Sequence, residues 1–350
     1  MGKKIFLFIL GILLFSCVDK KQSLPNTKLP NAKEISSLKN TIMIDDKCYS
    51  DFFVFDSLLI LIANCDSTLF HVYNKSNFNL IKKFGYKGAA PHEFMRPIMY
   101  NTNYLDTSGI FNFYDIHQLY NKKVDFNKIL LNYNIADCIE SVPIDENLMF
   151  CHEINFINDT ITVMRSVDKP EGLFMFYNKL TKNKKKFVNY YPKLKINEKY
   201  LNSSYYGLIN SNPQKKIIMY ASKYMDEILF FNLKGELIQQ YFFSEIKSPA
   251  LSTQFIGISN DAPIYSLRVY NTKKYSYVLR TNQSINTLLK SKKFPSQIFV
   301  FDWEGILIDI YNLPFLPYLF CVDDKTNVLY VININDDENN PSAEILTYQM

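Results

Sequence analysis

A hairpin pattern recurs along the chain at nearly constant spacing, and it limits the possible folds more than any other feature. A β-rich run ends in Asn or Asp, a turn follows, and a second β-rich run leaves the turn. The first runs of the five copies are His71–Asn74, Lys123–Asp125, Phe174–Asn178, Ile228–Asn232 and Ile298–Asp302. The second runs are Phe78–Ile81, Lys128–Leu130, Lys186–Val188, Glu236–Ile238 and Ile306–Ile308. In the last two copies a glycine supplies the positive φ that such a turn needs.

The Asn or Asp residues that open the turns lie 51, 53, 54 and 70 residues apart. Further strand candidates fill the intervals: Leu58–Ala63, Gly109–Tyr114, Thr160–Arg165, Lys216–Ala221, Tyr275–Arg280 and Val328–Ile332. Four short strands in each unit of about 40–50 residues are typical of a β-propeller blade. One or two β-sandwiches are the alternative, which accounts poorly for the regular spacing. The Lys/Ser/Asn-rich stretch 281–296 in the longest interval is interpreted as an inserted loop.

Five copies and a C-terminal unit make six blades. The last blade has strand candidates at Tyr318–Val322, Val328–Ile334 and Ala343–Tyr348, and it lacks a fourth strand. The segment Thr41–Asp45 can supply that strand, which pairs the two ends of the domain and removes an open sheet edge. The sequence therefore predicts an all-β, six-bladed propeller with four-stranded blades over residues 41–350. The abundance of Phe (28) and Tyr (25) agrees with many strands.

The first sixteen residues have the pattern of a secretion signal. Two lysines precede the apolar run Ile5–Phe15, and Ser16 and Cys17 follow it. This run is shorter than the roughly 20 residues that a membrane-spanning helix needs. Leu14-Phe15-Ser16-Cys17 resembles the bacterial lipobox, which implies cleavage before Cys17 and acylation of that cysteine with palmitate-type chains. An ordinary signal peptide with a chance cysteine is the alternative.

Residues 17–40 are polar, contain prolines and lack apolar periodicity, so we expect the lipidated Cys17 to be followed by a flexible tether. After Cys17 come Val18, Asp19, Lys20 and Lys21. An Asp directly after the cysteine would resemble an inner-membrane retention signal, and an acidic run just beyond the cysteine would resemble a surface-export signal. This chain has neither feature. The expected location is the outer membrane, facing the periplasm, with surface exposure left open.

The formal net charge of +5 is weak and dispersed, so nucleic acid is not an expected partner. Only four residues are arginine, which gives an anionic ligand no special support. A monomer is expected. Cys48–Cys65 or Cys138–Cys151 could form disulfides after export, whereas buried thiols are the expected state of most cysteines, Cys321 included.

The segment Phe84–Pro97 resembles the signature of the TolB-like six-bladed propeller lipoproteins of the Bacteroidota. The matching residues are Gly85, Gly88, Pro91, Glu93, Phe94 and Pro97, and Ala90 stands where the family has glycine. The resemblance implies a secreted, membrane-anchored propeller. It implies no established reaction.

Few residues carry a recognisable chemistry. His92-Glu93 and His152-Glu153 do not form the zinc-protease pattern H-E-x-x-H, and Glu93 is expected to accept hydrogen bonds from loop amides between blades. The acidic pairs are expected to be turn carboxylates: Asp45-Asp46, Asp323-Asp324 and Asp336-Asp337. The stretch Asn333–Asn340 is expected to be a solvated loop, and Trp303 a packing or surface residue. No catalytic residue, cofactor or metal ligand is predicted.

The expected function is non-enzymatic: a membrane-anchored scaffold or binding module for a protein, peptide or glycan at one face of the propeller. The alternative is a propeller enzyme that acts on glycans, as a hydrolase or a lyase. A cluster of carboxylates with a His in the channel favours the enzyme. A channel mouth of Tyr, Asn and Lys without a perturbed acid pair favours binding.

Overall fold

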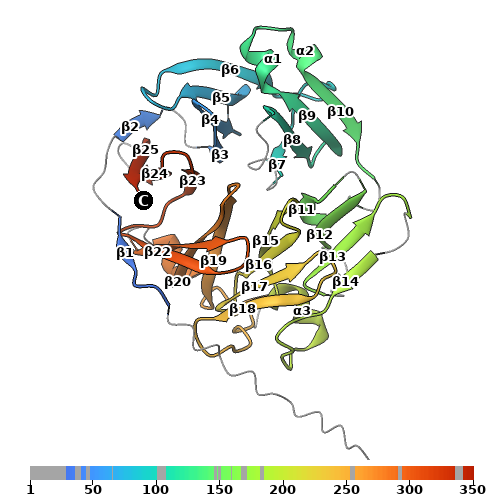
Figure 1. Ribbon diagram of the computed structural model, residues 1–350, viewed down its shortest axis with the longest axis vertical. Coiled ribbons are helices and arrows are strands. Elements are labelled where there is room, and N and C mark those ends of the chain that lie inside the picture. Colours follow the sequence, from blue (N-terminus) through green and yellow to red (C-terminus); the bar gives the residue numbers. More distant parts are fainter. Residues whose placement is uncertain are drawn as a thin grey trace, which may run out of the picture.

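Short apolar runs that end in tight turns build six antiparallel sheets, which stand around a common axis (Figure 1). The structure, a computed structural model, describes residues 29–35, 41–44, 48–64, 66–100, 108–145, 148, 151–158, 160–166, 172–181, 185–252, 257–290, 294–335 and 342–350. Within these residues the chain is the six-bladed propeller that the repeat predicts.

Each blade has four strands that follow one another along the chain, except at the closure. Blade 1 comprises β3 (Tyr49–Phe55), β4 (Leu58–Ala63), β5 (Thr68–Asn74) and β6 (Leu80–Tyr86). Blade 2 comprises β7 (Pro97–Met99), β8 (Ile110–Asp115), β9 (Tyr120–Asp125) and β10 (Ile139–Pro143). Blade 3 comprises β11 (Cys151–Phe156), β12 (Ile161–Ser166), β13 (Phe174–Asn178) and β14 (Lys185–Val188).

The second half of the ring repeats this order. Blade 4 comprises β15 (Gly207–Asn212), β16 (Ile217–Ser222), β17 (Glu227–Asn232) and β18 (Leu237–Phe242). Blade 5 comprises β19 (Pro263–Asn271), β20 (Tyr275–Ser284), β21 (Ser296–Asp302) and β22 (Leu307–Leu313), with β1 (Lys33–Glu34) added at its edge. Blade 6 comprises β23 (Leu319–Asp323), β24 (Val328–Asn335), β25 (Ser342–Gln349) and β2 (Thr41–Ile44). The innermost strands are β3, β7, β11, β15, β19 and β23 (Figure 1).

The apolar core lies between neighbouring blades. All six residues of β4 are buried because both faces of its sheet are covered. Phe53 of blade 1 contacts Phe111 of blade 2 with ring centroids 4.9 Å apart, and Phe230 of blade 4 contacts Phe301 of blade 5 at 5.3 Å. The abundant aromatic side chains therefore fill the layers between sheets, which fixes the inner strands around the channel.

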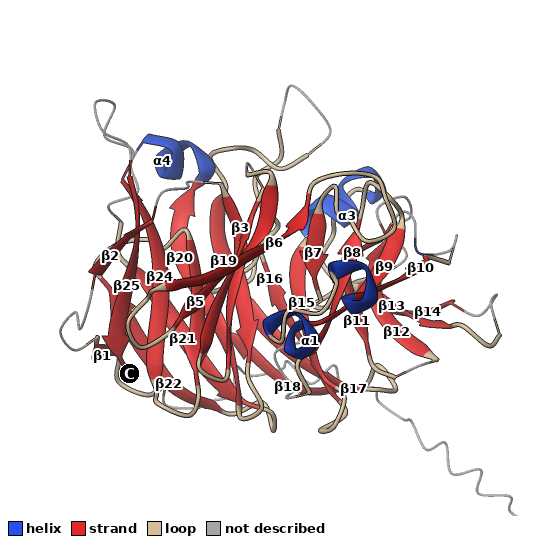
Figure 2. Cartoon of the chain, turned by 90° about the horizontal axis from the view of Figure 1, so that it is seen from above, coloured by secondary structure: helices blue, strands red, loops and turns tan. Residues whose placement is uncertain are grey.

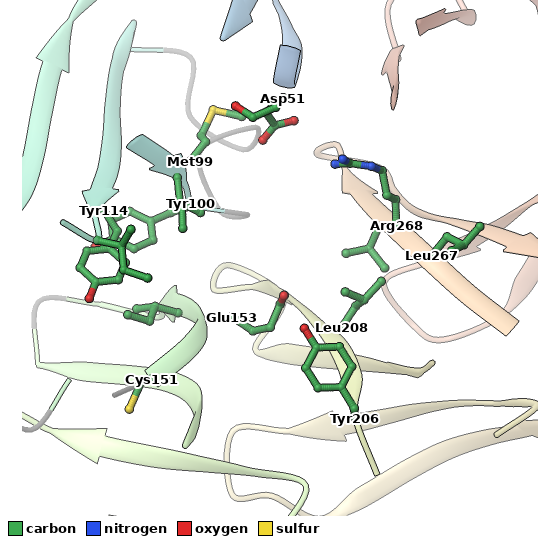
Figure 3. Close-up of a pocket in the computed structure, with 15 residues that line it drawn as sticks. Asp51, Met99, Tyr100, Tyr114, Cys151, Glu153, Tyr206, Leu208, Leu267 and Arg268 are labelled. Atoms are coloured by element: carbon green, nitrogen blue, oxygen red, sulfur yellow. The ribbon is translucent and has the colours of Figure 1, made fainter. Parts of the chain in front are cut away.

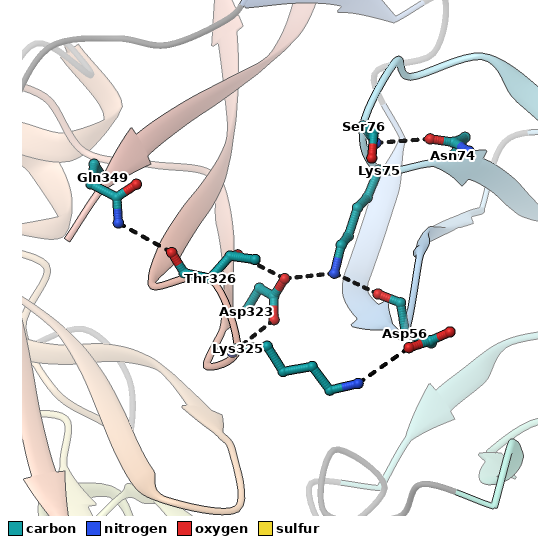
Figure 4. Close-up of polar contacts among 8 residues, drawn as sticks. All are labelled: Asp56, Asn74, Lys75, Ser76, Asp323, Lys325, Thr326 and Gln349. Carbon is teal, nitrogen blue, oxygen red and sulfur yellow. Dashed lines mark hydrogen bonds and ion pairs between the residues drawn. The ribbon is translucent and has the colours of Figure 1, made fainter.

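The ring closes through the N-terminal strand, as predicted. Strand β2 pairs antiparallel with β25, with Thr41 opposite Leu346 and Ile44 opposite Ala343. A separate set of contacts crosses the interface between blades 1 and 6 (Figure 4). Lys75 Nζ donates to Asp323 Oδ2 at 2.6 Å and to the Asp56 carbonyl at 2.5 Å.

Asp323 is therefore tied to both blades. Burial acts to raise the pKa of its carboxyl, but hydrogen bonds from Lys75, the Thr326 hydroxyl and the Lys325 amide outweigh burial and lower that pKa. Lys325 Nζ also lies 3.2 Å from Asp56 Oδ1, in an exposed ion pair. The closure of the ring thus rests on main-chain pairing within blade 6 and on one nearly buried charge pair between blades 6 and 1.

The second hairpin copy differs from the prediction. Lys128–Leu130 lies in helix α1 (Phe126–Leu130), not in a strand. Asp125 caps this helix, because its side chain accepts a hydrogen bond from the Lys128 amide at 3.1 Å. Helix α2 (Ile135–Cys138) follows, and β10 then provides the outer strand of blade 2.

The stretch 281–296 is not a simple inserted loop. Strand β20 continues to Ser284, and helix α4 (Ile285–Lys290) follows. The connection between β18 and β19, residues 243–262, accounts for much of the longer interval. Helix α3 (Glu198–Ser204) precedes β15, and Figure 2 shows α3 and α4 on the same side of the ring, which we call the upper face. The inner strands begin at this face.

Part of the predicted tether is paired with the propeller. Lys33 lies opposite Tyr311 and Glu34 opposite Asn312, in parallel register with β22. Lys33 Nζ lies 2.6 Å from Asp309 Oδ1, and Asn312 Nδ2 donates to Glu34 Oε1 at 2.7 Å. The chain therefore attaches to blade 5 before it completes blade 6.

The expectation that most cysteines are buried thiols is confirmed for Cys138, Cys151 and Cys321. Cys48 is disulfide-bonded, and Cys65 lies outside the described residues. Cys138 is a buried thiol whose pKa is raised by burial and which donates a hydrogen bond to the Asn134 carbonyl, so the Cys138–Cys151 pairing is wrong. Cys138 is the last residue of α2, and its side chain is buried in the apolar core. Cys321 is also a buried thiol.

Candidate channel site

A cavity of about 350 Å³ lies in the channel, near the N-terminal ends of the inner strands. Strands β3, β7, β11, β15 and β19 contribute to its wall. Apolar side chains form much of this wall, among them Leu208, Leu267 and Val269. Three charged residues join them: Asp51, Glu153 and Arg268.

These three residues come from alternate blades, and each lies at a break in strand register. The pairing of β3 with β4 shifts between Tyr49 and Asp51. The pairing of β11 with β12 shifts between His152 and Asn155, around Glu153. The pairing of β19 with β20 shifts between Ser266 and Arg268. By contrast, the pairings of β7, β15 and β23 with their neighbours show no such shift.

A β-bulge re-aims the side chain of the strand that carries it. Figure 3 shows the result: Asp51, Glu153 and Arg268 surround the same open space. In each of blades 1, 3 and 5, a β-bulge therefore places a charged side chain at the channel. This arrangement is the candidate site.

Glu153 occupies the most strained position in the wall. Its φ is +52°, in the left-handed region that residues with a Cβ adopt at a cost. Burial raises the pKa of its carboxyl, opposed by a backbone hydrogen bond from Ile209 and by the charges of Arg165 and Arg268.

Arg268 faces the channel with its donors available. Its guanidinium lies 6.0 Å from the centre of the Tyr318 ring. It makes no hydrogen bond or ion pair with any residue in the described ranges. A guanidinium carries five N–H donors, so an acceptor from outside the chain can be bound here.

Tyr206 completes the wall beside Glu153, and Figure 3 shows its hydroxyl pointing toward that carboxyl. Arg165 Cζ lies 4.9 Å from its ring centre, and Lys223 Nζ lies 5.4 Å from it. Arg165 is only 3 % exposed and donates to the Tyr205 carbonyl at 2.6 Å. Two cations therefore hold the aromatic ring, and its hydroxyl remains directed into the cavity.

The family motif lies between blades 1 and 2, away from the cavity wall. Glu93 Oε2 accepts a hydrogen bond from the Ala90 amide at 2.9 Å, as expected. A Cβ on Gly88 would lie 2.0 Å from this carboxylate oxygen, which explains the glycine. Phe94 is fully buried, and the buried Lys122 ammonium lies 4.9 Å from its ring centre.

The other motif residues have related roles. Gly85 has a φ of +75°, and a Cβ there would lie 2.5 Å from Phe70. Lys122 Nζ donates to the Pro91 carbonyl at 3.0 Å, and Pro97 begins β7 opposite Asp115. The motif is a connector that fixes the entry of the chain into blade 2.

The remaining sequence candidates lie apart from the cavity. Asp323 ends β23 and Asp324 follows it in the turn. Asp324 accepts a hydrogen bond from the Tyr277 hydroxyl at 3.1 Å, and burial raises the pKa of its carboxyl. Trp303 is buried and donates to the Thr272 carbonyl at 3.1 Å, so it is a packing residue. Of the described residues, no three His, Cys, Asp or Glu side chains gather where they could hold a metal ion.

Several predicted features lie outside the described residues: Cys17 with the signal, Asp45-Asp46, Asp336-Asp337 and most of Asn333–Asn340. Over the ranges that are described, no helix has the length and apolar character to cross a membrane. His152 is in β11, next to Glu153, and His92 is in the connector.

Sequence reasoning did not find Asp51, Arg268 or Tyr206, and it saw Glu153 only as part of a His-Glu pair. The register shifts that aim these residues depend on pairing between strands. An isolated charge inside an apolar strand, as in Ser-Leu-Arg268-Val-Tyr, was the available signal.

The sequences of curated proteins show no match to this chain. Among solved structures, a member of the DUF4221 family from Bacteroides vulgatus is similar, with a TM-score of 0.59 and 12 % identity over 90 % of this chain and 97 % of that one. A Bacteroides fragilis protein assigned as exported has a TM-score of 0.51 and 14 % identity, over 90 % of this chain and 95 % of that one. These likenesses show the fold. The model of the TolB-like 6-blade propeller-like family matches residues 27–325, and the chain therefore belongs to that family.

Proposed function

We propose that this protein is a lipid-anchored envelope protein whose propeller is a non-enzymatic binding module, with the channel cavity as its ligand site. The observation that carries the proposal is the set of three bulges that aim Asp51, Glu153 and Arg268 into one cavity. Irregular strands lower the stability of the fold, and proteins keep such strands mainly where they position the residues of a functional site. The ligand is a protein segment, a peptide or a glycan that enters the channel.

A photo-crosslinking residue tests this proposal. It replaces Leu208, which lines the cavity, or Ile238, which is 45 % exposed on the outer strand β18. Both proteins are expressed in the native membrane and irradiated. A covalent adduct at position 208 and its absence at position 238 are expected. Equal adducts at both positions, or adducts at 238 alone, would contradict a channel site.

A glycan hydrolase or lyase is the second candidate, and one observation favours it. A carboxyl whose pKa is raised by burial is suited to general acid catalysis, and Glu153 has this property. Extracted envelope glycans incubated with the protein are then expected to yield new reducing ends or unsaturated sugars. Turnover that disappears in Glu153→Gln would replace the binding proposal with an enzymatic one, and absence of turnover would leave binding as the function.

A further inference from the structure

We propose that the channel cavity binds a sugar acid, a ligand with one carboxylate and several hydroxyl groups, with its carboxylate on Arg268. This inference rests on the proposed binding function and names the ligand class for the same site. Each part of the wall offers a matching chemistry.

The carboxylate position follows from Arg268. Its planar guanidinium can form two parallel hydrogen bonds with a carboxylate, which a lysine cannot do. No acceptor from the described residues uses these donors, and the tyrosine ring at 6.0 Å contacts the side chain without consuming an N–H group. The scarcity of arginine gave an anionic ligand no support at the sequence level, but one of the four arginines is placed in the channel wall.

The hydroxyl positions follow from the oxygen atoms on the other sides of the cavity. Asp51, Glu153 and the Tyr206 hydroxyl can each accept a hydrogen bond from a sugar hydroxyl. Two carboxyl groups repel a ligand with several negative charges, so the site favours a single carboxylate oriented toward Arg268. The aliphatic side chains of Leu208, Leu267 and Val269 can pack against the C–H faces of a sugar ring.

The size of the cavity agrees with this ligand class. Its volume of about 350 Å³ lies near the lower end of the range for small-molecule sites, roughly 300–1,000 Å³. A fatty carboxylate would place an alkyl chain against the oxygens of Asp51, Glu153 and Tyr206, and packing an apolar chain against polar atoms that it shields from water is costly. A hydroxylated carboxylate presents hydroxyl groups to these oxygens instead.

Three probes separate recognition of the carboxylate from recognition of the hydroxyl groups: glucuronate has both, glucose has hydroxyls alone, and hexanoate has a carboxylate alone. A fourth probe, tetra-alanine, has a peptide backbone. Galacturonate accompanies glucuronate so that one stereochemistry does not decide the result. Calorimetry with the full chain is expected to give at least tenfold tighter binding for one of the two sugar acids than for the other probes. Tighter binding of tetra-alanine, or equal affinity for glucose and both sugar acids, would overturn the inference.

Variants then locate the preference. Arg268→Gln is expected to lower the affinity for the sugar acid to that for glucose, and Arg268→Lys, which keeps the charge, to give an intermediate value. Arg96→Gln is the matched control, because Arg96 is exposed and does not line the cavity. Melting temperatures confirm that the variants are folded. A sugar-acid preference that survives in folded Arg268→Gln also contradicts the assignment.

The two proposals fail differently. Equal binding of glucose and sugar acids overturns the ligand class and leaves the channel as a binding site. If no probe binds, the ligand class is overturned, and the crosslink at position 208 alone decides whether the channel binds anything.

Discussion

At the scale of single residues, the features that disfavour the folded state lie around the channel. Glu153 combines a left-handed backbone with a carboxyl in a desolvating wall, and either feature alone disfavours the folded state. Arg165, behind it, donates to main-chain carbonyls and to Asn202. A neutral residue with the shape of glutamate would be easier to fold here, and the proposed function accounts for the carboxyl as a group that contacts the ligand.

Glu153→Gln is expected to stabilise the protein in a pH-dependent manner. The folded-state pKa of Glu153 lies above its unfolded value, so the wild type loses stability as pH rises from the unfolded pKa of about 4.3 through the folded pKa. The variant lacks this loss. Urea unfolding should therefore show a higher free energy of unfolding for the variant at pH 8 and a smaller difference at pH 4. A constant difference across this range would assign the effect to shape and not to charge.

Cys17→Ser tests the lipid anchor. The motivation is the cysteine directly after the apolar run, in a sequence that resembles the lipobox. The variant is expected to lose palmitate labelling and membrane retention, because several acyl chains anchor far more firmly than any weak surface contact. Retention of both the label and the membrane fraction would show that another residue carries the anchor.

At the scale of elements, local sequence predicted the strands well where the turn chemistry was unambiguous. Asn232 with Gly235, and Asp302 with Gly305, define tight hairpins, and both glycines have φ near +80°. Asp125 was ambiguous because the same side chain opens a turn or caps a helix, and the burial of Phe126 and Ile129 selected the helix. The channel site depends on register shifts between strands, which no local pattern encodes.

The two N-terminal strands are expected to contribute unequally to stability. Deletion of residues 18–35 removes β1 and an ion pair in which Lys33 is 55 % exposed, at a cost of no more than about 1 kcal/mol. Deletion of residues 18–46 also removes β2, which leaves β25 as an open edge and should cost more than about 3 kcal/mol. Chemical denaturation of both truncations, against the chain without residues 1–17, measures the difference. Equal stabilities would contradict the role of β2 in closure.

At the scale of the whole molecule, the chain that forms the ring is interrupted once, inside blade 6, between β25 and β2. Main-chain pairing of β2 with β25 closes this break, and the ion pair between Lys75 and Asp323 joins blade 1 to blade 6 on the side opposite the upper face. A propeller distributes its core over every blade interface, so loss of this closure exposes the apolar layer between blades 6 and 1.

Lys75→Met is expected to destabilise the protein by about 1–3 kcal/mol at pH 7, because Asp323 is left nearly buried without its cation. The folded pKa of Asp323 is lowered, so the stability it contributes is present above its unfolded pKa of about 3.9 and is lost as pH falls through the folded value. The difference between variant and wild type should therefore shrink in acid. Lys325→Met is the control, because its ion pair is exposed and should change stability by less than about 0.5 kcal/mol. An equal effect of both variants would contradict a special role for Lys75.

The whole protein is expected on the outer membrane, facing the periplasm, because Asp19 is the only acidic residue between Cys17 and the two lysines that follow. Protease treatment of intact cells should then leave the propeller uncut until the outer membrane is permeabilised. Loss of the propeller from intact cells, while a periplasmic control protein survives, would place it on the cell surface.

The attachment of β1 to blade 5 has a mechanical consequence. A force applied to the chain before Lys33 meets the parallel pairing with β22 first, and it reaches the closing strand β2 only after that pairing is sheared apart. If the chain is anchored by lipid at Cys17 as proposed, a pull from the membrane would load the pairing of Lys33 and Glu34 with blade 5 before it loads β2. The closure of the ring would then be shielded from that force for as long as the pairing with β22 holds.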